Sequence, residues 1–395
     1  MTSTLVANVT IHDGKPGSTP SVGDVLIDDG RIQSVGANSA SADTVVEATG
    51  KHLVPGLIDC HVHLFMNAEP TAIEDYMQAD DAAKLGWAKA NCESLVRSGV
   101  TTIREIAAPN ALMAQLLHDL DTKNLPAPRI LPAFSNITTF GGHGHFLGVE
   151  AESIDDLRRA ARDQVESGAR FVKIMASGGV MTPTSDPTSS QYSSDQLRAV
   201  VEEAAAAGIP CAAHAHSIEA VRNSVEAGIT SIEHGTFVDA PTAELMARAG
   251  TWLVPTVATL HFVGNNIAHP ALPDWAREKV EALRPVFYKH VDAALAAGVR
   301  IAAGSDMGIQ FVEHTSETLA REVAVYVERG MSPSMALASA TSQASEMLGI
   351  ADEVGTIDPG KVADLVLVAD DPADDLMALS RPDTVWQSGC VVSGT

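Results

Sequence analysis

The stretch of sequence that decides the fold is residues 54–64, which read Val54-Pro55-Gly56-Leu57-Ile58-Asp59-Cys60-His61-Val62-His63-Leu64. The stretch is mostly apolar, as expected of a buried strand, and it ends in two histidines spaced two positions apart. Because side chains alternate faces along a strand, His61 and His63 point to the same side. Such a pair can hold a metal ion if the rest of the chain supplies further ligands.

Residues 54–63 are the first of eight strand-like segments that alternate with helix-like segments. The strand-like segments are 54–63, 100–106, 129–134, 170–176, 209–215, 230–234, 251–257 and 300–305. The helix-like segments are 79–98, 110–121, 153–167, 194–207, 217–227, 241–249, 275–297 and 315–329. Eight strands that are each followed by a helix predict an α/β protein with a (β/α)8 TIM-like barrel. The alternative is an open doubly wound sheet, but no Gly-x-Gly-x-x-Gly motif follows an early strand to indicate a dinucleotide fold.

The two ends of the chain have a different pattern from the middle. Short apolar or alternating segments separated by Asp-Gly turns occupy residues 1–53, and similar segments, including 362–368 and 384–392, occupy residues 354–395. Neither end has enough strands for a stable unit of its own. We therefore expect residues 1–53 and 354–395 to pair into one small β-sandwich, with residues 54–353 forming the catalytic barrel.

The composition narrows the classes of function. The chain has 395 residues and a formal net charge of −24, which argues against binding to nucleic acid or to an anionic membrane. No run approaches the roughly 18 apolar residues of a membrane span. The N-terminal residues lack the features of a signal peptide, and the four cysteines have no zinc-ribbon spacing. We expect a cytoplasmic protein that binds a small molecule and forms a homo-oligomer.

Residues able to bind metal recur at the ends of the predicted strands. They are His61, His63, Lys173, His214, His216, His234 and Asp306. Each has an ordinary structural explanation when it is taken alone: a core histidine, a lysine that reaches solvent, or an aspartate that caps a helix. In barrel enzymes, however, the carboxyl ends of the strands carry the chemistry. Their joint occurrence therefore predicts a metal centre at that face.

These motifs resemble the amidohydrolase superfamily over nearly the whole chain. The matching stretches are Pro55–His63, His214-Ala215-His216, Glu233-His234-Gly235, Gly304-Ser305-Asp306 and the C-terminal Gly355–Leu365. The stretches Val172–Gly179 and Gly141–His145 are most similar to the imidazolonepropionase-like branch, which includes metal-dependent Xaa-Pro dipeptidases (prolidases) and related carboxypeptidases.

The resemblance implies a centre with two divalent metal ions, usually zinc. His61, His63 and Asp306 would hold one ion, and His214 and His234 the other. A carbamate formed from CO₂ on Lys173 would bridge them, since two cations stabilise a buried anion. Spacing alone leaves open which of His214 and His216 is the ligand, because both face one way; the family pattern favours His214.

The expected mechanism is attack by a hydroxide that bridges the two ions. Asp306 would accept its proton and deliver it to the leaving nitrogen. His143 and Tyr192 would be further hydrogen-bond donors to the substrate, and His145 is a weaker candidate. His143 lies in the loop 134–148 and Tyr192 in the loop 177–193, and loops of this length inside a domain are usually functional.

The expected reaction is cleavage of a C–N amide bond in a small dipeptide, an N-acyl amino acid or an amide-containing xenobiotic. Apolar residues around the predicted site, namely Phe140, Met181, Leu260 and Phe262, would suit an aromatic acyl group. The alternative on the same site is a hydrolase of cyclic amides, lactones or ureas. A more distant alternative is a non-catalytic relative that keeps the barrel as a scaffold, although a scaffold would not need the whole ligand set.

Overall fold

The two ends of the chain form one sheet. The computed structural model describes residues 3–36, 41–180, 182–309 and 315–394. The strands of this sheet are β1 (Thr4–Ile11), β2 (Ser21–Asp28), β3 (Arg31–Gly36), β4 (Thr44–Glu47), β5 (His52–Pro55), β15 (Leu365–Val368), β16 (Pro382–Gln387) and β17 (Cys390–Gly394). They are ordered β17-β16-β15-β5-β1-β2-β3, with β4 paired to β1. Strands from the two ends of the chain therefore share one sheet.

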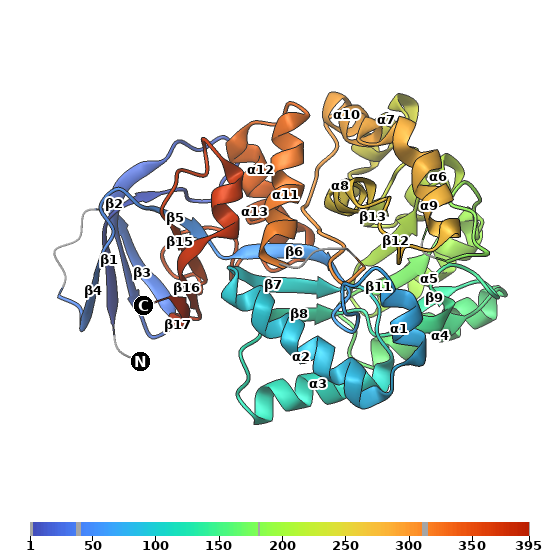
Figure 1. The fold of residues 1–395 in the computed structure, drawn as a ribbon, viewed down its shortest axis with the longest axis horizontal. Helices are drawn as coiled ribbons and strands as arrows, with labels where there is room; N and C mark the ends of the chain where they lie inside the picture. Colours follow the sequence, from blue (N-terminus) through green and yellow to red (C-terminus); the bar gives the residue numbers. More distant parts are fainter. Residues whose placement is uncertain (1–2, 37–40, 181, 310–314, 395) are drawn as a thin grey trace.

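The N- and C-terminal segments meet where β5 pairs antiparallel with β15, with Leu53 opposite Leu367. Behind them lies a separate apolar core that includes Ile27, Ile32 and Trp386, all nearly inaccessible to solvent. Figure 1 shows this sheet at one end of the molecule, beside the larger α/β unit.

Parallel strands form the centre of the α/β unit. They are β6 (Leu57–Val62), β7 (Val100–Glu105), β8 (Arg129–Pro132), β9 (Asn136–Thr138), β10 (Gly148–Glu150), β11 (Val172–Met175), β12 (Cys211–Ala215), β13 (Ser231–His234) and β14 (Trp252–Val254). These strands form two sheets, one ordered β6-β7-β8 and the other ordered β10-β9-β11-β12-β13-β14. Most of these strands are buried along their whole length, as expected for parallel strands covered by helices.

Backbone hydrogen bonds link these two sheets. The amide of Arg170 donates to the carbonyl of Pro132 at 2.9 Å. On the other side, Leu253 bridges to Ile301, and the amide of Cys60 donates to the carbonyl of Ala303 at 2.9 Å. The segment predicted as a strand at 300–305 thus lies between β14 and β6, although only isolated bridges form there. The result is a TIM-barrel-like α/β fold.

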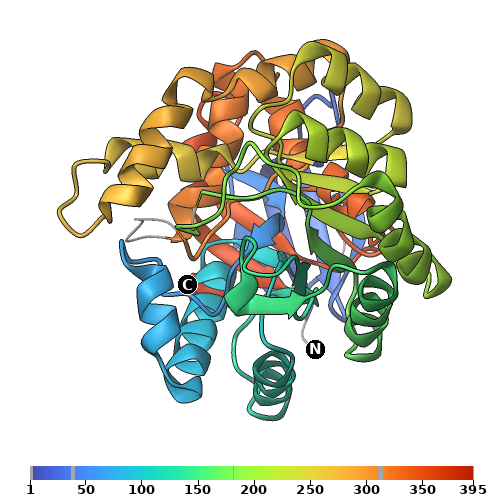
Figure 2. The same ribbon diagram turned by 90° about the vertical axis from the view of Figure 1, so that its right-hand side faces the viewer.

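Helices surround these strands, as Figure 2 shows in the view from the side of the α/β unit. The α-helices are α1 (Ala72–Gln78), α2 (Asp81–Arg97), α3 (Asn110–Thr122), α4 (Ile154–Glu166), α5 (Ser194–Ala206), α6 (Ile218–Ala227), α7 (Ala240–Ala249), α8 (Val257–Asn265), α9 (Asp274–Leu283), α10 (Lys289–Ala297), α11 (Thr315–Glu328), α12 (Pro333–Ser339) and α13 (Ser342–Met347). Short 3₁₀ turns are η1 (His145–Leu147), η2 (Arg284–Val286) and η3 (Leu376–Ser380). Among the described helices, none is long and apolar enough to cross a bilayer.

Three predicted elements are interrupted in the structure. The strand expected at 54–63 is divided at Gly56 into the end of β5, which belongs to the terminal sheet, and β6 of the α/β unit. The helix expected at 275–297 is divided into α9, η2 and α10, because Pro285 lacks the amide hydrogen that a continuous helix needs. The strand expected at 384–392 is a hairpin of β16 and β17. Its turn contains Ser388 and Gly389, both with positive φ.

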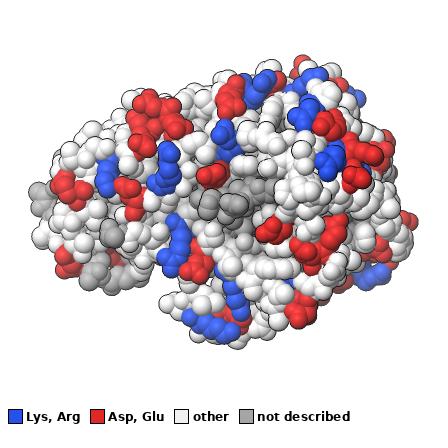
Figure 3. All heavy atoms as spheres, in the orientation of Figure 1, with Lys and Arg blue, Asp and Glu red and all other residues white. Residues whose placement is uncertain are grey.

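Acidic and basic side chains are interspersed on the molecular face in Figure 3. Ion pairs also link neighbouring helices: Arg158 of α4 contacts both Glu202 and Glu203 of α5. Such exposed pairs contribute little to stability individually, about 0–1 kcal/mol each.

Candidate metal centre

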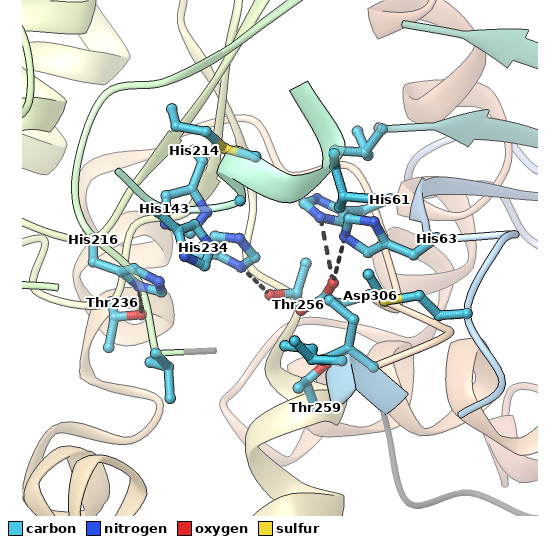
Figure 4. A pocket seen from close by; sticks show the side chains of 18 of the residues that line it. His61, His63, His143, His214, His216, His234, Thr236, Thr256, Thr259 and Asp306 are labelled. Atoms are coloured by element: carbon cyan, nitrogen blue, oxygen red, sulfur yellow. Dashed lines mark hydrogen bonds and ion pairs between the residues drawn. The ribbon is translucent and has the colours of Figure 1, made fainter. Parts of the chain in front are cut away.

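Side chains from the carboxyl ends of several strands converge on one cavity of about 850 Å³. Its lining includes all six residues predicted as metal ligands: His61, His63, Lys173, His214, His234 and Asp306. Figure 4 shows the five labelled members of this set, with His61, His63 and Asp306 on one side and His214 and His234 on the other. Strand order explains the convergence, since parallel strands present their carboxyl ends at the same face.

The first group of ligand atoms is formed by His61, His63 and Asp306. One carboxylate oxygen of Asp306 lies 3.4 Å from Nε2 of His61 and 3.3 Å from Nε2 of His63. Burial opposes the charge on Asp306, but the adjacent rings of His61 and His63 outweigh it and lower the pKa of the carboxyl group. Two imidazole nitrogens and an ionised carboxylate therefore face one point, which is a donor set suited to zinc.

Behind this group lies a buried ion pair that was not predicted from the sequence. Nδ1 of His61 lies 2.8 Å from Oε2 of Glu233, and Oε1 of Glu233 accepts a hydrogen bond from Arg104 at 2.7 Å. Burial opposes the charge on Glu233, yet Arg104 and His61 lower the pKa of its carboxyl group to about 2. The ionised Glu233 accepts a hydrogen bond from the N–H at Nδ1 of His61, so Nε2 of the ring keeps its lone pair on the side of Asp306.

The second group is formed by His214, His216 and His234, whose ring nitrogens lie within 4.8 Å of one another. Nδ1 of His216 lies 2.8 Å from the hydroxyl of Thr236, and Nδ1 of His234 lies 2.7 Å from the hydroxyl of Thr256. His61 and His234 connect the two groups, with ring centroids 5.0 Å apart. Since His214 and His216 both line the cavity, the geometry keeps both of them as candidate ligands.

These imidazoles are neutral at neutral pH, as metal ligands must be. Burial lowers the pKa of His61 to about 4 and the pKa of His216 to about 3. Burial also lowers the pKa of His214 and of His234 well below the ordinary value, with the neighbouring histidines adding to the effect.

Lys173 lies on β11 and lines the same cavity, and its side chain is completely buried. No hydrogen-bond partner for its Nζ is found among the described residues. Burial lowers the pKa of the Lys173 amine to about 8, an effect that Glu233 opposes and Arg104 reinforces. An unpartnered buried amine is costly, so the site is incomplete without a further group at this nitrogen.

His143 reaches the cavity from the loop after β9. Its ring centroid lies 4.3 Å from that of His214, and its Nδ1 lies 2.9 Å from the hydroxyl of Thr182. The close approach requires a glycine at position 179, where a Cβ atom would lie 2.4 Å from the His143 ring. His143 is therefore placed to contact a bound molecule.

Tyr192 does not reach the cavity. Its hydroxyl donates a hydrogen bond to the carbonyl of Ala151 at 2.8 Å, and its buried ring packs with the core instead. The expectation that Tyr192 contacts substrate is thus corrected by the structure. His145 is also absent from the lining, and its Nδ1 lies 3.1 Å from the carbonyl of Gly142.

Backbone strain occurs at three residues that line the cavity at or just after the ends of strand-like segments. His234, Thr256 and Asp306 have φ values of 71°, 52° and 56°, in the left-handed region that residues other than glycine seldom adopt. Each position costs about 1–3 kcal/mol and persists where surrounding structure imposes it, commonly at functional sites. Here the strained residues include two candidate ligands and the threonine that contacts one of them.

Apart from Thr236, Thr256 and Thr259, the rest of the cavity wall is apolar. It includes Met66, Ile73, Ile106, Phe146, Leu147, Val180, Val263, Val280 and Ile309. Among the described residues of the lining, Lys173 is the only lysine or arginine. The cavity therefore favours an uncharged, hydrophobic molecule that places one polar bond beside the histidines.

The apolar residues predicted for this wall are different ones. Phe140 is 65% exposed and absent from the lining, and Phe262 is also absent from it. Met181 and the side chain of Leu260 lie outside the described residues.

Comparison with known proteins shows which family this chain resembles. The amidohydrolase family pattern matches residues 52–394. Ochratoxinase of Aspergillus niger is 28% identical over 376 residues, which cover 87% of this chain and 76% of that protein. A Xaa-Pro dipeptidase with methionine bound in its active site has a TM-score of 0.90 at 28% identity, covering 98% of this chain and 99% of that one. A prolidase in complex with N-methylphosphonate-L-proline has a TM-score of 0.90 at 27% identity, with both chains fully covered.

Proposed function

Because this chain belongs to the amidohydrolase family, we propose that it is a metal-dependent hydrolase that cleaves the amide bond of a small, predominantly apolar molecule. The observation that carries the proposal is the convergence of six potential ligands on one cavity with an apolar wall. A scaffold without activity would have no need for the buried, strained and mutually oriented histidines at this position.

His61, His63 and Asp306 would hold one divalent cation, and His214 and His234 the other. Lys173 would bridge them as a carbamate. The unpartnered Nζ of Lys173 supports this assignment, since its lowered pKa makes more of the neutral amine that reacts with CO₂ available. The nitrogen-rich donor set favours zinc. Two such ions would lower the pKa of a bound water and polarise the scissile carbonyl.

The protein's own groups would then position the substrate and move the proton. Asp306, held in a strained conformation beside His61 and His63, would accept the proton of the attacking water and transfer it to the leaving nitrogen. His143 would donate a hydrogen bond to the carbonyl oxygen, with Thr182 fixing its ring orientation. The apolar wall would exclude other water molecules from the reacting bond.

A dipeptide or an N-acyl amino acid is a second candidate substrate. It is favoured by the structural likeness to a Xaa-Pro dipeptidase and a prolidase. The described lining contains no arginine and no lysine other than Lys173, which argues against it, because a free substrate carboxylate would need a basic partner. The name of the ochratoxinase relative indicates a toxin, and not a dipeptide, as the substrate of that protein. A lactone or urea remains the third class.

The same proposal includes a complete (β/α)8 barrel over residues 54–353 and a β-sandwich built from residues 1–53 and 354–395. The hydrogen bonds from Leu253 to Arg300 and from Cys60 to Ala303 support closure of the barrel.

A substrate panel tests the function directly. Purified protein loaded with zinc would be assayed on apolar N-acyl amides, Xaa-Pro dipeptides, N-acyl amino acids, phenylureas and lactones. We expect the highest kcat/KM for amides with a large apolar acyl group. Activity confined to lactones or ureas would reject amide hydrolysis, and activity confined to dipeptides would reject the apolar substrate class.

A further inference from the structure

A second cluster of metal-binding side chains lies in the terminal sheet, outside the cavity. His12 directly follows β1, His52 begins β5, and Asp371 lies three residues after β15. β5 pairs with both β1 and β15, as Figure 1 shows, so segments from opposite ends of the chain come together there. None of the three residues lines the cavity described above.

Three atoms of this cluster form a nearly equilateral triangle. Nε2 of His12 lies 3.1 Å from Nδ1 of His52 and 3.5 Å from Oδ1 of Asp371, and the third side, from His52 to Asp371, is 3.6 Å. Zinc bound tetrahedrally at 2.0–2.1 Å holds its ligand atoms about 3.3 Å apart. The triangle has the size of such a coordination face without any movement of the backbone.

Hydrogen bonding alone leaves the cluster incompletely satisfied. A proton between His12 and His52 would account for the 3.1 Å contact, but the two distances to Asp371 are longer than the 2.7–3.2 Å of ordinary N–H···O bonds. A cation would contact all three atoms at once. His12 is only 6% exposed, so its partners matter for the free energy of folding.

The surroundings also suit a cation. The amide of Ala373 donates to Oδ1 of Asp371 at 2.8 Å and fixes the carboxylate, as second interactions commonly do at metal sites. Burial lowers the pKa of His12, with Asp371 opposing, so its imidazole is neutral and free to bind metal at neutral pH. A cleft of about 390 Å³ reaches His12 and Pro372 and gives a water molecule access as a fourth ligand.

We propose that His12, His52 and Asp371 bind one divalent cation, with zinc as the best match to two imidazoles and a carboxylate. This ion would be structural. It would join the end of β1 and the start of β5 to the segment after β15, and thereby fasten the N-terminal and C-terminal parts of the sheet together. The site is independent of the proposed hydrolase activity.

Metal stoichiometry tests the proposal in the full-length protein. Wild type, Asp371→Asn and His52→Gln would be stripped with a chelator, reloaded with Zn²⁺, desalted and measured by elemental analysis. We expect each variant to hold one equivalent less than wild type and to keep the kcat of wild type. His118→Gln is the matched control, because His118 is exposed on α3 and belongs to no cluster of potential ligands among the described residues.

Thermal unfolding gives a second measurement that does not depend on activity. Added Zn²⁺ should raise the Tm of Asp306→Asn, and this increase should be smaller in the double variant Asp306→Asn/Asp371→Asn. Equal zinc content in wild type, Asp371→Asn and His52→Gln would overturn the proposal and leave a hydrogen-bonded cluster. Failure of the catalytic centre would instead lower the zinc content of all proteins equally, leaving the difference between them intact.

Discussion

Glu233 contacts His61, a proposed metal ligand, on the side of the imidazole ring opposite Asp306. Oε2 of Glu233 lies 2.8 Å from Nδ1 of His61, while Nε2 of His61 lies 3.4 Å from Asp306. The two residues are 172 positions apart and both are buried. A carboxylate at Nδ1 fixes the tautomer and orientation of the ring and makes Nε2 a stronger metal ligand.

Replacing Glu233 with glutamine should weaken metal binding while leaving the ligands themselves in place. We expect Glu233→Gln to lower the affinity for zinc by about 10–100-fold, the usual effect of losing such a partner. Competition with a chromogenic chelator would measure the affinity. Glu202→Gln, an exposed residue paired with Arg158, is the matched control. Unchanged affinity in Glu233→Gln would show that His61 does not need this carboxylate.

The contact between Glu233 and His61 could not be predicted from the sequence, although the positions of the candidate ligands could. Alternation along residues 54–64 places His61 and His63 on one face, and strand order brings Lys173, His214, His234 and Asp306 to the same end. The contact to Glu233 depends instead on the curvature that carries β13 toward β6 across the barrel-like ring, and no local pattern encodes this distance. The orientation of Tyr192 could not be predicted from the sequence either, because it depends on the carbonyl of Ala151, which accepts a hydrogen bond from the Tyr192 hydroxyl.

Element boundaries were predictable where local chemistry marks them. Helix α5 begins at Ser194, directly after the N-cap residue Ser193, whose side chain forms a capping box with Gln196. Pro285 and the pair Ser388-Gly389 are residues that commonly interrupt helices and strands, but the predicted helix and strand continued through them. The segment 300–305 occupies the place between β14 and β6 that was predicted for a strand. It forms only isolated bridges there, because it lies where the two parallel sheets meet.

Asp306→Asn should preserve the fold and remove most of the turnover. Asparagine has the same shape but cannot accept the proton of the attacking water, and general acid–base groups typically contribute about 10²–10⁴-fold. Steady-state kinetics on the best substrate of the panel, with zinc content measured in parallel, would separate lost chemistry from lost metal. A kcat above about a tenth of wild type would exclude this role for Asp306.

Lys173 should carry a carbamate in the metal-loaded protein. Lys173→Ala should lose zinc and activity together, and acetate or propionate should restore part of both by supplying the missing carboxylate. Protein prepared with ¹³C-bicarbonate should show a carbamate carbon signal by NMR that is absent from Lys173→Ala. Full zinc content and normal turnover in Lys173→Ala would contradict the bridge, as would the lack of a carbamate signal in active wild type.

Glu322 should make the stability of the protein depend on pH. Burial raises the pKa of its carboxyl group from 4.5 to about 8, even though Tyr326 and the amide of Ala258 donate hydrogen bonds to it. Between these pH values the folded state holds a proton that the unfolded chain has released. The stabilisation is therefore fully present below about pH 4.5 and falls by about 1.4 kcal/mol per pH unit until about pH 8.

Urea unfolding at several pH values would measure this slope. Glu322→Gln stays neutral in both states, so its free energy of unfolding should decline less steeply than that of wild type between about pH 5 and pH 8. Glu328→Gln, on the exposed side of the same helix α11, should keep the wild-type slope. Equal slopes in wild type and Glu322→Gln would show that Glu322 is ionised in the folded protein.

The apolar wall of the cavity should determine affinity for the acyl group of the substrate. Phe146 lines the cavity and packs against Tyr76 in a tilted arrangement, with ring centroids 5.9 Å apart. Removing a buried aromatic contact costs about 1.5–3 kcal/mol, so Phe146→Ala should raise KM for apolar amides by about 10–100-fold. Phe140→Ala is a closely matched control, because Phe140 lies on the same loop but is 65% exposed and outside the lining. Both variants should retain zinc and keep kcat within a few-fold of wild type, since neither side chain touches the candidate ligands. If Phe146→Ala and Phe140→Ala had the same KM, the substrate would not occupy this wall, and the proposed preference for an apolar acyl group would have to be abandoned.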